Sequence, residues 1–204
     1  MKLKVGIIGG SGYTGIELLR ILHQHPSADV HAITSRALKG KKLYEVFPNM
    51  HGMSDLTYLL PDDAKLFDCD LVFFATPHGV AMNNASLFLD RNIKVIDLGA
   101  DFRINDADIW SDWYKMGHTQ ASLLNEAVYG QPEINRSTIK KARLIANPGC
   151  YPTAVLLALK PLLENNLIEP SNIIADCKSG TSGAGRNANQ ATLFCEVTQS
   201  FKPY

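Results

Sequence analysis

The sequence lacks an excess of charge of either sign, because its 20 lysines and arginines are matched by 20 aspartates and glutamates. This balance argues against nucleic acids and anionic membranes as partners, since both select basic surfaces. No apolar run approaches the roughly 18 residues that suggest a membrane span. The first apolar stretch runs straight into glycines, without the longer core and cleavage site of a signal peptide. We therefore expect a cytoplasmic protein.

Cysteine is scarce, and its spacing shows no CxxC pair among Cys69, Cys150, Cys177 and Cys195. In a chain of 204 residues this spacing is typical of reduced thiols rather than of a disulfide framework. We expect no metal site. Three of the cysteines, Cys69, Cys177 and Cys195, lie in apolar or strand-like stretches, and we interpret them as buried apolar filler.

The first part of the chain alternates strand and helix patterns. Strands are expected within 2–9, 29–36, 69–77, 93–102 and 142–149, and helices within 14–25 and 79–92. Strands separated by helices predict an α/β fold with a parallel, doubly wound (Rossmann) sheet. The stretch 105–143 is more polar and irregular.

The composition changes near residue 147, where we place a boundary between a nucleotide-binding domain (1–147) and a second region (148–204). Residues 153–167 are apolar on almost every face, which predicts a buried helix. Residues 172–180 and 191–201 are expected to be strands on either side of a glycine-rich loop at 179–186. Two strands do not complete a sheet, so we interpret 148–204 as the start of an α+β catalytic domain.

A glycine-rich turn follows the first predicted strand and opens the first predicted helix. The segment "GIIGGSGYTG" contains Gly10-x-Gly12-x-x-Gly15 and also Gly9-x-x-Gly12-x-x-Gly15. This context is required of a dinucleotide-binding turn, in which the glycines admit the pyrophosphate beside a helix N-terminus. The alternative is a strand-to-helix turn that needs glycines for its geometry alone.

The end of the second predicted strand indicates which dinucleotide binds. An NAD site would place an acid about 20 residues after the glycines, to bind the ribose 2′-hydroxyl. The segment "ITSRALKGKK" offers Ser35, Arg36 and Lys39, and no acid occurs before Glu45. Because a guanidinium attracts a 2′-phosphate, we prefer NADP over NAD. The alternative is a solvated basic loop.

The segment "NPGCYPTA" places Cys150 in a strand-to-helix turn rather than inside an element. Pro152 suits the first turn of a helix, where a missing N–H costs nothing. Cys150 then lies at the helix N-terminus, where backbone donors and the helix dipole favour a thiolate. A thiolate at the carboxyl edge of an open sheet is a nucleophile for a carbonyl carbon.

Six segments together resemble the N-acetyl-γ-glutamyl-phosphate reductase family, within the wider aspartate-semialdehyde dehydrogenase group. They are "IIGGSGYTGIELLRIL", "TPHG", "DLGADFR", "YGQPEI", "NPGCYPTA" and "SGTSGAGR". The resemblance implies NADPH-dependent reduction of an acyl phosphate in arginine biosynthesis. Cys150 would displace phosphate from N-acetylglutamyl 5-phosphate to give a thioester. Hydride from NADPH would then release N-acetylglutamate 5-semialdehyde.

The resemblance also implies roles for particular residues. It places in the cofactor site Gly9, Ser11, Gly12, Tyr13, Thr14 and Gly15 of the turn, Pro77 and His78 of a pocket loop, and Ser182, Gly183 and Ala184 of a second loop. We take His78 as a loop residue rather than as the general base. Arg103 and Arg186 are candidates for the substrate phosphate, and structural salt bridges are the alternative for both.

The chain departs from the family in one respect. The family's catalytic histidine is expected beyond Tyr204, so we expect the chain to be an N-terminal portion that is nearly inactive alone. The family also suggests a homo-oligomer. One alternative keeps the fold but changes the acyl phosphate, as in aspartate-semialdehyde dehydrogenase-type enzymes. Another is a noncatalytic NADP-binding module.

Overall fold

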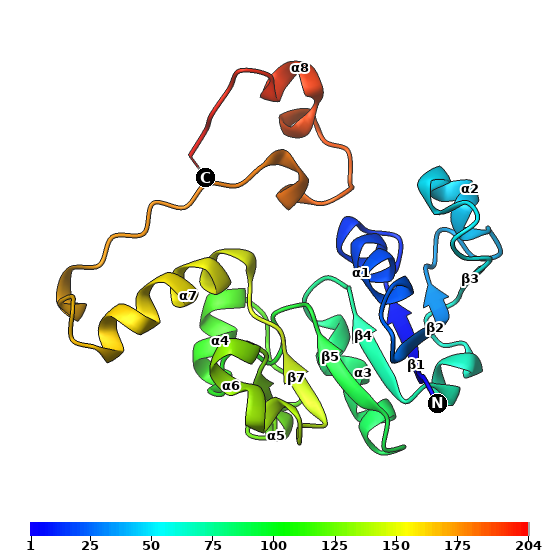
Figure 1. The fold of residues 1–204 in the computed structure, drawn as a ribbon, viewed down its shortest axis with the longest axis horizontal. Helices are drawn as coiled ribbons and strands as arrows, with labels where there is room; N and C mark the ends of the chain where they lie inside the picture. The colour runs from blue at the N-terminus through cyan, green and yellow to red at the C-terminus, as the bar shows by residue number, and fades with distance from the viewer. Residues whose placement is uncertain (204) are drawn as a thin grey trace.

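A parallel sheet organises the first three quarters of the chain. The computed structural model describes residues 1–203. Its strands lie in the order β3-β2-β1-β4-β5-β7-β6, and all neighbouring pairs are parallel. This confirms the predicted doubly wound α/β fold (Figure 1). The strands are β1 (Leu3–Ile8), β2 (Ala28–Thr34), β3 (Tyr58–Leu59), β4 (Leu71–Phe74), β5 (Lys94–Asp97), β6 (Val128–Tyr129) and β7 (Leu144–Ala146).

Helices connect the strands and continue beyond the last one. The α-helices are α1 (Tyr13–His23), α2 (Leu43–Val46), α3 (Val80–Leu89), α4 (Ala107–Tyr114), α5 (Ala121–Leu124), α6 (Pro132–Ile139), α7 (Cys150–Glu164) and α8 (Phe194–Val197). Short 3-10 helices are η1 (Pro48–Met50), η2 (Ala64–Asp68), η3 (Pro170–Asn172), η4 (Thr181–Ala184) and η5 (Gln190–Thr192). The polar stretch 105–143 therefore holds α4, α5, β6 and α6. Within residues 1–203, no helix combines the length and the apolar character needed to cross a membrane.

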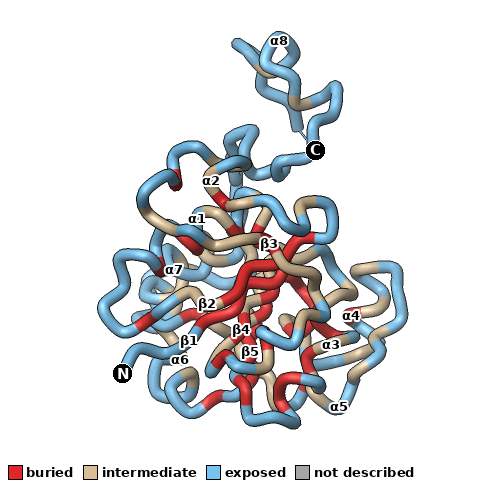
Figure 2. The backbone as a smooth tube through the Cα atoms, turned by 90° about the vertical axis from the view of Figure 1, so that its right-hand side faces the viewer, coloured by how far each residue is buried: buried red, intermediate tan, exposed pale blue. Residues whose placement is uncertain are grey.

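Side chains of the central strand alternate between two cores. Val5 and Ile7 pack with Leu19 of α1 on one face of the sheet, and Ile8 packs with Phe88 of α3 on the other. Figure 2 shows the buried backbone concentrated in these central strands. Because all the strands are parallel, their carboxyl ends meet at one edge of the sheet, where ligands bind in open α/β folds.

The helix after β7 does not bury its apolar residues. α7 forms where the sequence predicts a helix, but it has no buried residue, and Leu156, Leu157 and Leu162 are exposed. The prediction of a buried helix is therefore wrong for this chain. A helix that is apolar on almost every face needs cover on every face, and no element of residues 1–203 supplies it.

The two strands predicted after α7 are also wrong. Residues 173–180 form no strand, and η5 and α8 occupy most of 190–197. A pair of strands is marginal without further strands or a helix to cover it, and the described residues provide neither. As a consequence Cys177 and Cys195 are exposed, which corrects their interpretation as buried filler, whereas Cys69 is buried as predicted.

Candidate functional site

The turn after β1 requires glycine at two positions for steric reasons. Gly9 has a φ of +86°, and a Cβ added there would lie 2.4 Å from the carbonyl oxygen of Ala75. A Cβ added to Gly15 would lie 2.6 Å from the Cα of Gly10. The first glycine lets the turn pass beside the end of β4, and the last lets α1 pack against the turn. Both requirements are typical of a dinucleotide-binding turn.

The middle of this turn faces open space. Gly12 is the N-cap of α1, makes no side-chain cap, and would bring an added Cβ within 4 Å of no atom. The first N–H groups of a helix lack intrahelical partners. Those of Tyr13, Thr14 and Gly15 therefore lie at the positive end of the α1 dipole, beside a space that no side chain fills. This cradle fits the pyrophosphate of a dinucleotide.

The end of β2 supports the turn and carries a cation. The backbone N–H of Gly9 donates to Oγ1 of Thr34 at 3.3 Å, and Thr34 is fully buried. Ser35 is also buried, and its N–H donates to the carbonyl of Leu59 at 3.0 Å. Arg36 is exposed. The preference for a 2′-phosphate at Ser35 and Arg36 stays a prediction.

The loop after β4 lies beside the turn. Pro77 and His78 are exposed, and the His78 ring lies 5.0 Å from the ring of Tyr114 in α4. The hydroxyl of Thr76 is buried and has no hydrogen-bond partner within the described chain. This loop therefore presents polar atoms at the point between β1 and β4 where the strand order reverses, which is the ligand crevice of doubly wound sheets.

Cys150 is the first residue of α7 and is exposed. β7 ends at Ala146, and Asn147 still belongs to the sheet edge, because its N–H donates to the carbonyl of Asp97 at 2.8 Å. Gly149 is the N-cap and makes no side-chain cap. The predicted position of Cys150 at a helix start is confirmed. The same edge of the sheet carries the glycine turn, because both turns follow the carboxyl ends of parallel strands.

The guanidinium of Arg103 contacts the turn that leads to Cys150. Its Nε donates to the carbonyl of Asn147 at 2.7 Å, and its Nη2 donates to the carbonyl of Leu98 at 3.0 Å. A Cβ added to Gly149 would lie 3.2 Å from Nη1 of Arg103. The guanidinium is thus fixed against the residue before Cys150. Its contacts are backbone carbonyls, rather than the carboxylate of a structural salt bridge.

Two buried acids build the loop that carries Arg103, and neither was proposed from the sequence. Asp97 accepts from the N–H groups of Gly99 at 2.8 Å and Asp101 at 3.1 Å. Asp101 in turn accepts from the N–H of Gly79 at 2.8 Å, at the start of α3. Burial and the neighbouring Asp101 raise the pKa of Asp97 to about 7. The one sign of this turn in the sequence is the pair of acids in "DLGADFR", at the end of a predicted strand and shortly after it.

The glycine-rich segment at 179–186 approaches the site through its last residue. Ser182, Gly183 and Ala184 lie in η4 and are exposed. Arg186 reaches the dinucleotide turn, where its Nη1 donates to the carbonyl of Ser11 at 3.2 Å. The structure therefore places Arg186 over β1, whereas Arg103 and Cys150 lie at β7. The two candidates for the substrate phosphate therefore lie at different strands of the sheet.

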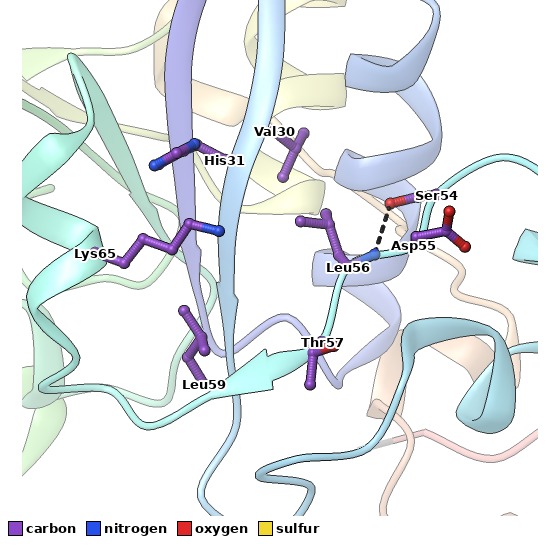
Figure 3. Close-up of a pocket in the computed structure, with 8 residues that line it drawn as sticks. All are labelled: Val30, His31, Ser54, Asp55, Leu56, Thr57, Leu59 and Lys65. Atoms are coloured by element: carbon purple, nitrogen blue, oxygen red, sulfur yellow. Dashed lines mark hydrogen bonds between the residues drawn. The ribbon is translucent and has the colours of Figure 1, made fainter.

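A separate pocket of about 370 Å³ lies along the outer edge of the sheet (Figure 3). The short strand β3 pairs only with Ile33 and Thr34 of β2. The pocket lies beside the earlier part of β2, which has no pairing with β3. Its lining residues are Val30, His31, Ser54, Asp55, Leu56, Thr57, Leu59 and Lys65. None of these belongs to the glycine turn or to the cysteine turn. Among residues 1–203, no group of His, Cys, Asp or Glu is arranged to hold a metal ion.

Comparison with known families gives two matches along the chain. Residues 4–142 match the model of the semialdehyde dehydrogenase NAD binding domain. Residues 150–204 match that of the semialdehyde dehydrogenase dimerisation domain. The chain therefore carries a nicotinamide-dinucleotide-binding domain of this kind, followed by residues similar to a dimerisation domain.

Curated relatives and solved structures are similar to the chain as well. It is 62% identical to an N-acetyl-gamma-glutamyl-phosphate reductase of Vesicomyosocius okutanii and 61% identical to that of Ruthia magnifica. In both cases the match covers 99% of the chain and 59% of the relative, so the chain spans about three fifths of their length. Aspartate semialdehyde dehydrogenase II of Vibrio cholerae, complexed with ASA, has a TM-score of 0.61 at 20% identity, covering 80% of this chain and 47% of that one. The Candida albicans enzyme with NADP has a TM-score of 0.56 at 18% identity, covering 79% and 47%. These structures support the fold.

Proposed function

The chain belongs to the semialdehyde dehydrogenase family, and from this premise we propose that the whole protein is an NADPH-dependent N-acetyl-γ-glutamyl-phosphate reductase of arginine biosynthesis. One observation carries the proposal. The exposed Cys150 begins α7 at the same sheet edge as a glycine cradle for a dinucleotide, with a fixed guanidinium against the preceding residue. This arrangement supports a nucleophile, an anion-binding group and a cofactor turn at one edge of the sheet.

Cys150 is the proposed nucleophile. Its sulfur, at the start of α7, attacks the acyl carbon of N-acetylglutamyl 5-phosphate. A C–S bond forms, the bond between the acyl carbon and the bridging phosphate oxygen breaks, and inorganic phosphate leaves with the electron pair of that bond. The product on the protein is a thioester at Cys150. Arg103 binds the departing phosphate, because its guanidinium is held beside Gly149 and carries charge that matches the leaving group.

The residues of the first turn bind the cofactor. When bound, the nicotinamide supplies the hydride that reduces the thioester to N-acetylglutamate 5-semialdehyde and frees the thiolate. The turn formed by Gly9, Ser11, Gly12, Tyr13, Thr14 and Gly15 would hold the pyrophosphate, with the free N–H groups at the start of α1 as the donors. Pro77 would line the cofactor pocket, and the loop formed by Ser182, Gly183 and Ala184 would contact the cofactor near its nicotinamide and pyrophosphate. Ser35 and the exposed Arg36 select NADPH over NADH through the 2′-phosphate.

The organisation of the whole protein follows from the same premise. We propose a domain boundary near residue 147, with 1–147 binding NADPH and the following residues beginning the catalytic and dimerisation domain. The match of residues 150–204 to a dimerisation domain supports a homo-oligomer. Four free cysteines support a reduced, cytoplasmic environment.

The test is a phosphate-release assay with N-acetylglutamyl 5-phosphate. We expect about one equivalent of inorganic phosphate per chain in the acylation step, and none from the Cys150→Ser variant. Intact-mass analysis locates the acyl group. Release that persists in the serine variant would refute the thioester route. Faster release from β-aspartyl phosphate than from the glutamyl compound would favour the aspartate-semialdehyde dehydrogenase alternative, and binding of NADPH with no acylation would favour a noncatalytic module.

A further inference from the structure

Arg186, at the end of the glycine-rich segment 179–186, makes two contacts outside that segment. Its Nη1 donates to the carbonyl oxygen of Ser11 at 3.2 Å, across 175 positions of sequence. Its guanidinium also lies over the ring of Phe47, with Cζ 4.6 Å from the ring centroid. These contacts hold the guanidinium in a cation–π stack directly above the dinucleotide turn.

Several polar groups of the turn are already hydrogen-bonded within the protein. Thr34 accepts from the N–H groups at positions 9 and 10, at 3.3 and 3.0 Å. The hydroxyl of the fully buried Tyr58 donates to the carbonyl of Gly10 at 3.2 Å. Burial raises the pKa of Tyr58 to about 12, and the charge of Arg186 acts against that rise, so the guanidinium also lies near this phenol. The start of α1 and the guanidinium of Arg186 therefore lie together at the part of the turn that can meet a ligand.

The substrate phosphate cannot be the partner of this guanidinium. In the sheet, β7 lies three strands from β1, and at the usual strand spacing this separates the cysteine turn from the glycine turn by roughly 14 Å. Phe47 follows α2, on the β2 and β3 side of β1, which takes Arg186 further from β7. The leaving phosphate forms at Cys150 and faces Arg103.

We propose that Arg186 is a cofactor-binding residue whose guanidinium binds the pyrophosphate of the dinucleotide at the turn. The proposal rests on the proposed function, because it takes the glycine turn to be the cofactor site. It replaces the prediction that Arg186 binds the substrate phosphate. The hydrogen bond from Arg186 to Ser11 also holds the end of the loop 182–184 at the glycine turn. The proposal therefore places this loop next to the bound cofactor.

The experiment compares NADPH and NADH binding to the unchanged chain and to Arg186→Met, by titration calorimetry. The two cofactors share the pyrophosphate and differ in the 2′-phosphate. We expect Arg186→Met to lower the affinities for NADPH and for NADH by the same factor, about tenfold, because one charge-assisted contact is lost. The control is Arg36→Met, which should weaken NADPH while leaving NADH nearly unchanged. Arg186→Lys, which keeps the charge but loses the planar stack on Phe47, should fall between the variant and the unchanged chain.

Because Arg186 is exposed, its replacement does not threaten the fold, and thermal unfolding checks this. The rate of Cys150 acylation by N-acetylglutamyl 5-phosphate is measured on Arg186→Met as a separate readout of a role toward the substrate phosphate. Unaltered cofactor binding, or slower acylation with unaltered binding, would overturn the inference while leaving the proposed function intact. An unchanged chain that binds neither cofactor would overturn both the inference and the cofactor part of the proposed function.

Discussion

Helices α1 and α7 start at the same edge of the same sheet, yet they end in opposite environments. α1 has 11 residues and buries Gly15, Leu19 and Leu22, whereas α7 has 15 residues and buries none. α1 lies on the core formed by β1 and β2, and α7 runs past the end of the sheet (Figure 1). An apolar sequence therefore makes a helix require a partner surface. Whether the helix is buried depends on whether the rest of the fold supplies that surface.

Side chains on the sheet face that packs against α1 become less buried from β1 toward β7. By register, Ile7, Ile96 and Ile145 lie in one row on that face. Ile7 is fully buried under α1, whereas Ile96 and Ile145 are only half-buried. The two regions therefore differ in how much cover they have, rather than in the apolar character of their strands and helices.

Amide hydrogen exchange should show the largest difference between the regions. Amides of β1 and β4 open only with global unfolding and should exchange on the order of 10⁴-fold more slowly than in an unfolded chain. Amides of α7 and of residues 165–203 should show little protection, because a 15-residue helix without packing is marginal in water. Mass-spectrometric exchange of the intact chain measures both. Equal protection in α7 and β1 would contradict the contrast.

The pH dependence of stability should expose the buried acid of the first region. The pKa of Asp97 rises from 3.8 to about 7 on folding, so its protonated form is favoured in the folded state. The stabilisation that folding gains from the protonated Asp97 carboxyl is fully present below about pH 4 and is lost as the pH rises toward 7. Asp97→Asn mimics the protonated acid, so its stability relative to the unchanged chain should rise between pH 4 and pH 7 by on the order of 4 kcal/mol.

Urea unfolding at both pH values measures this change. The exposed Glu196 of the second region supplies the control, and Glu196→Gln should leave the pH dependence nearly unchanged. A parallel pH dependence for the Asp97 variant and the unchanged chain would show that the buried carboxyl does not titrate in this range.

A matched pair of leucines gives the smallest of these differences. Leu19 in α1 is 1% exposed and Leu157 in α7 is 40% exposed. Leu19→Ala should lower the free energy of unfolding by about 3 kcal/mol, because it opens a cavity in a packed core. Leu157→Ala should change it by less than about 0.5 kcal/mol. Denaturant unfolding compares the two, and a similar loss from both variants would mean that α7 is covered.

The sequence predicted those parts of the fold that depend on local pattern. The strands around Val5, Val72 and Val95 and the glycine turn could be read because a buried strand and a tight turn each leave a local signature. The position of Cys150 could be read for the same reason, from the glycine and proline beside it.

Features that depend on distant partners could not be predicted. Strands at 172–180 and 191–201 were expected from composition, but a strand exists only with a neighbour to pair with. The roles of Asp97 and Asp101 depend on burial and on backbone donors that the fold brings to them. The position of Arg186 on Ser11 joins residues 175 positions apart, and no local pattern encodes it.

The most direct test concerns the thiol at the start of α7. Cys150, Cys177 and Cys195 are all exposed, whereas burial raises the pKa of Cys69 to about 11. With iodoacetamide at neutral pH, followed by peptide mass mapping, Cys150 should be alkylated at least about tenfold faster than the other two exposed thiols, and Cys69 slowest of all. Saturating NADPH should slow the labelling of Cys150 alone. If the three exposed thiols react alike and NADPH protects none of them, Cys150 is not a nucleophile facing the dinucleotide site.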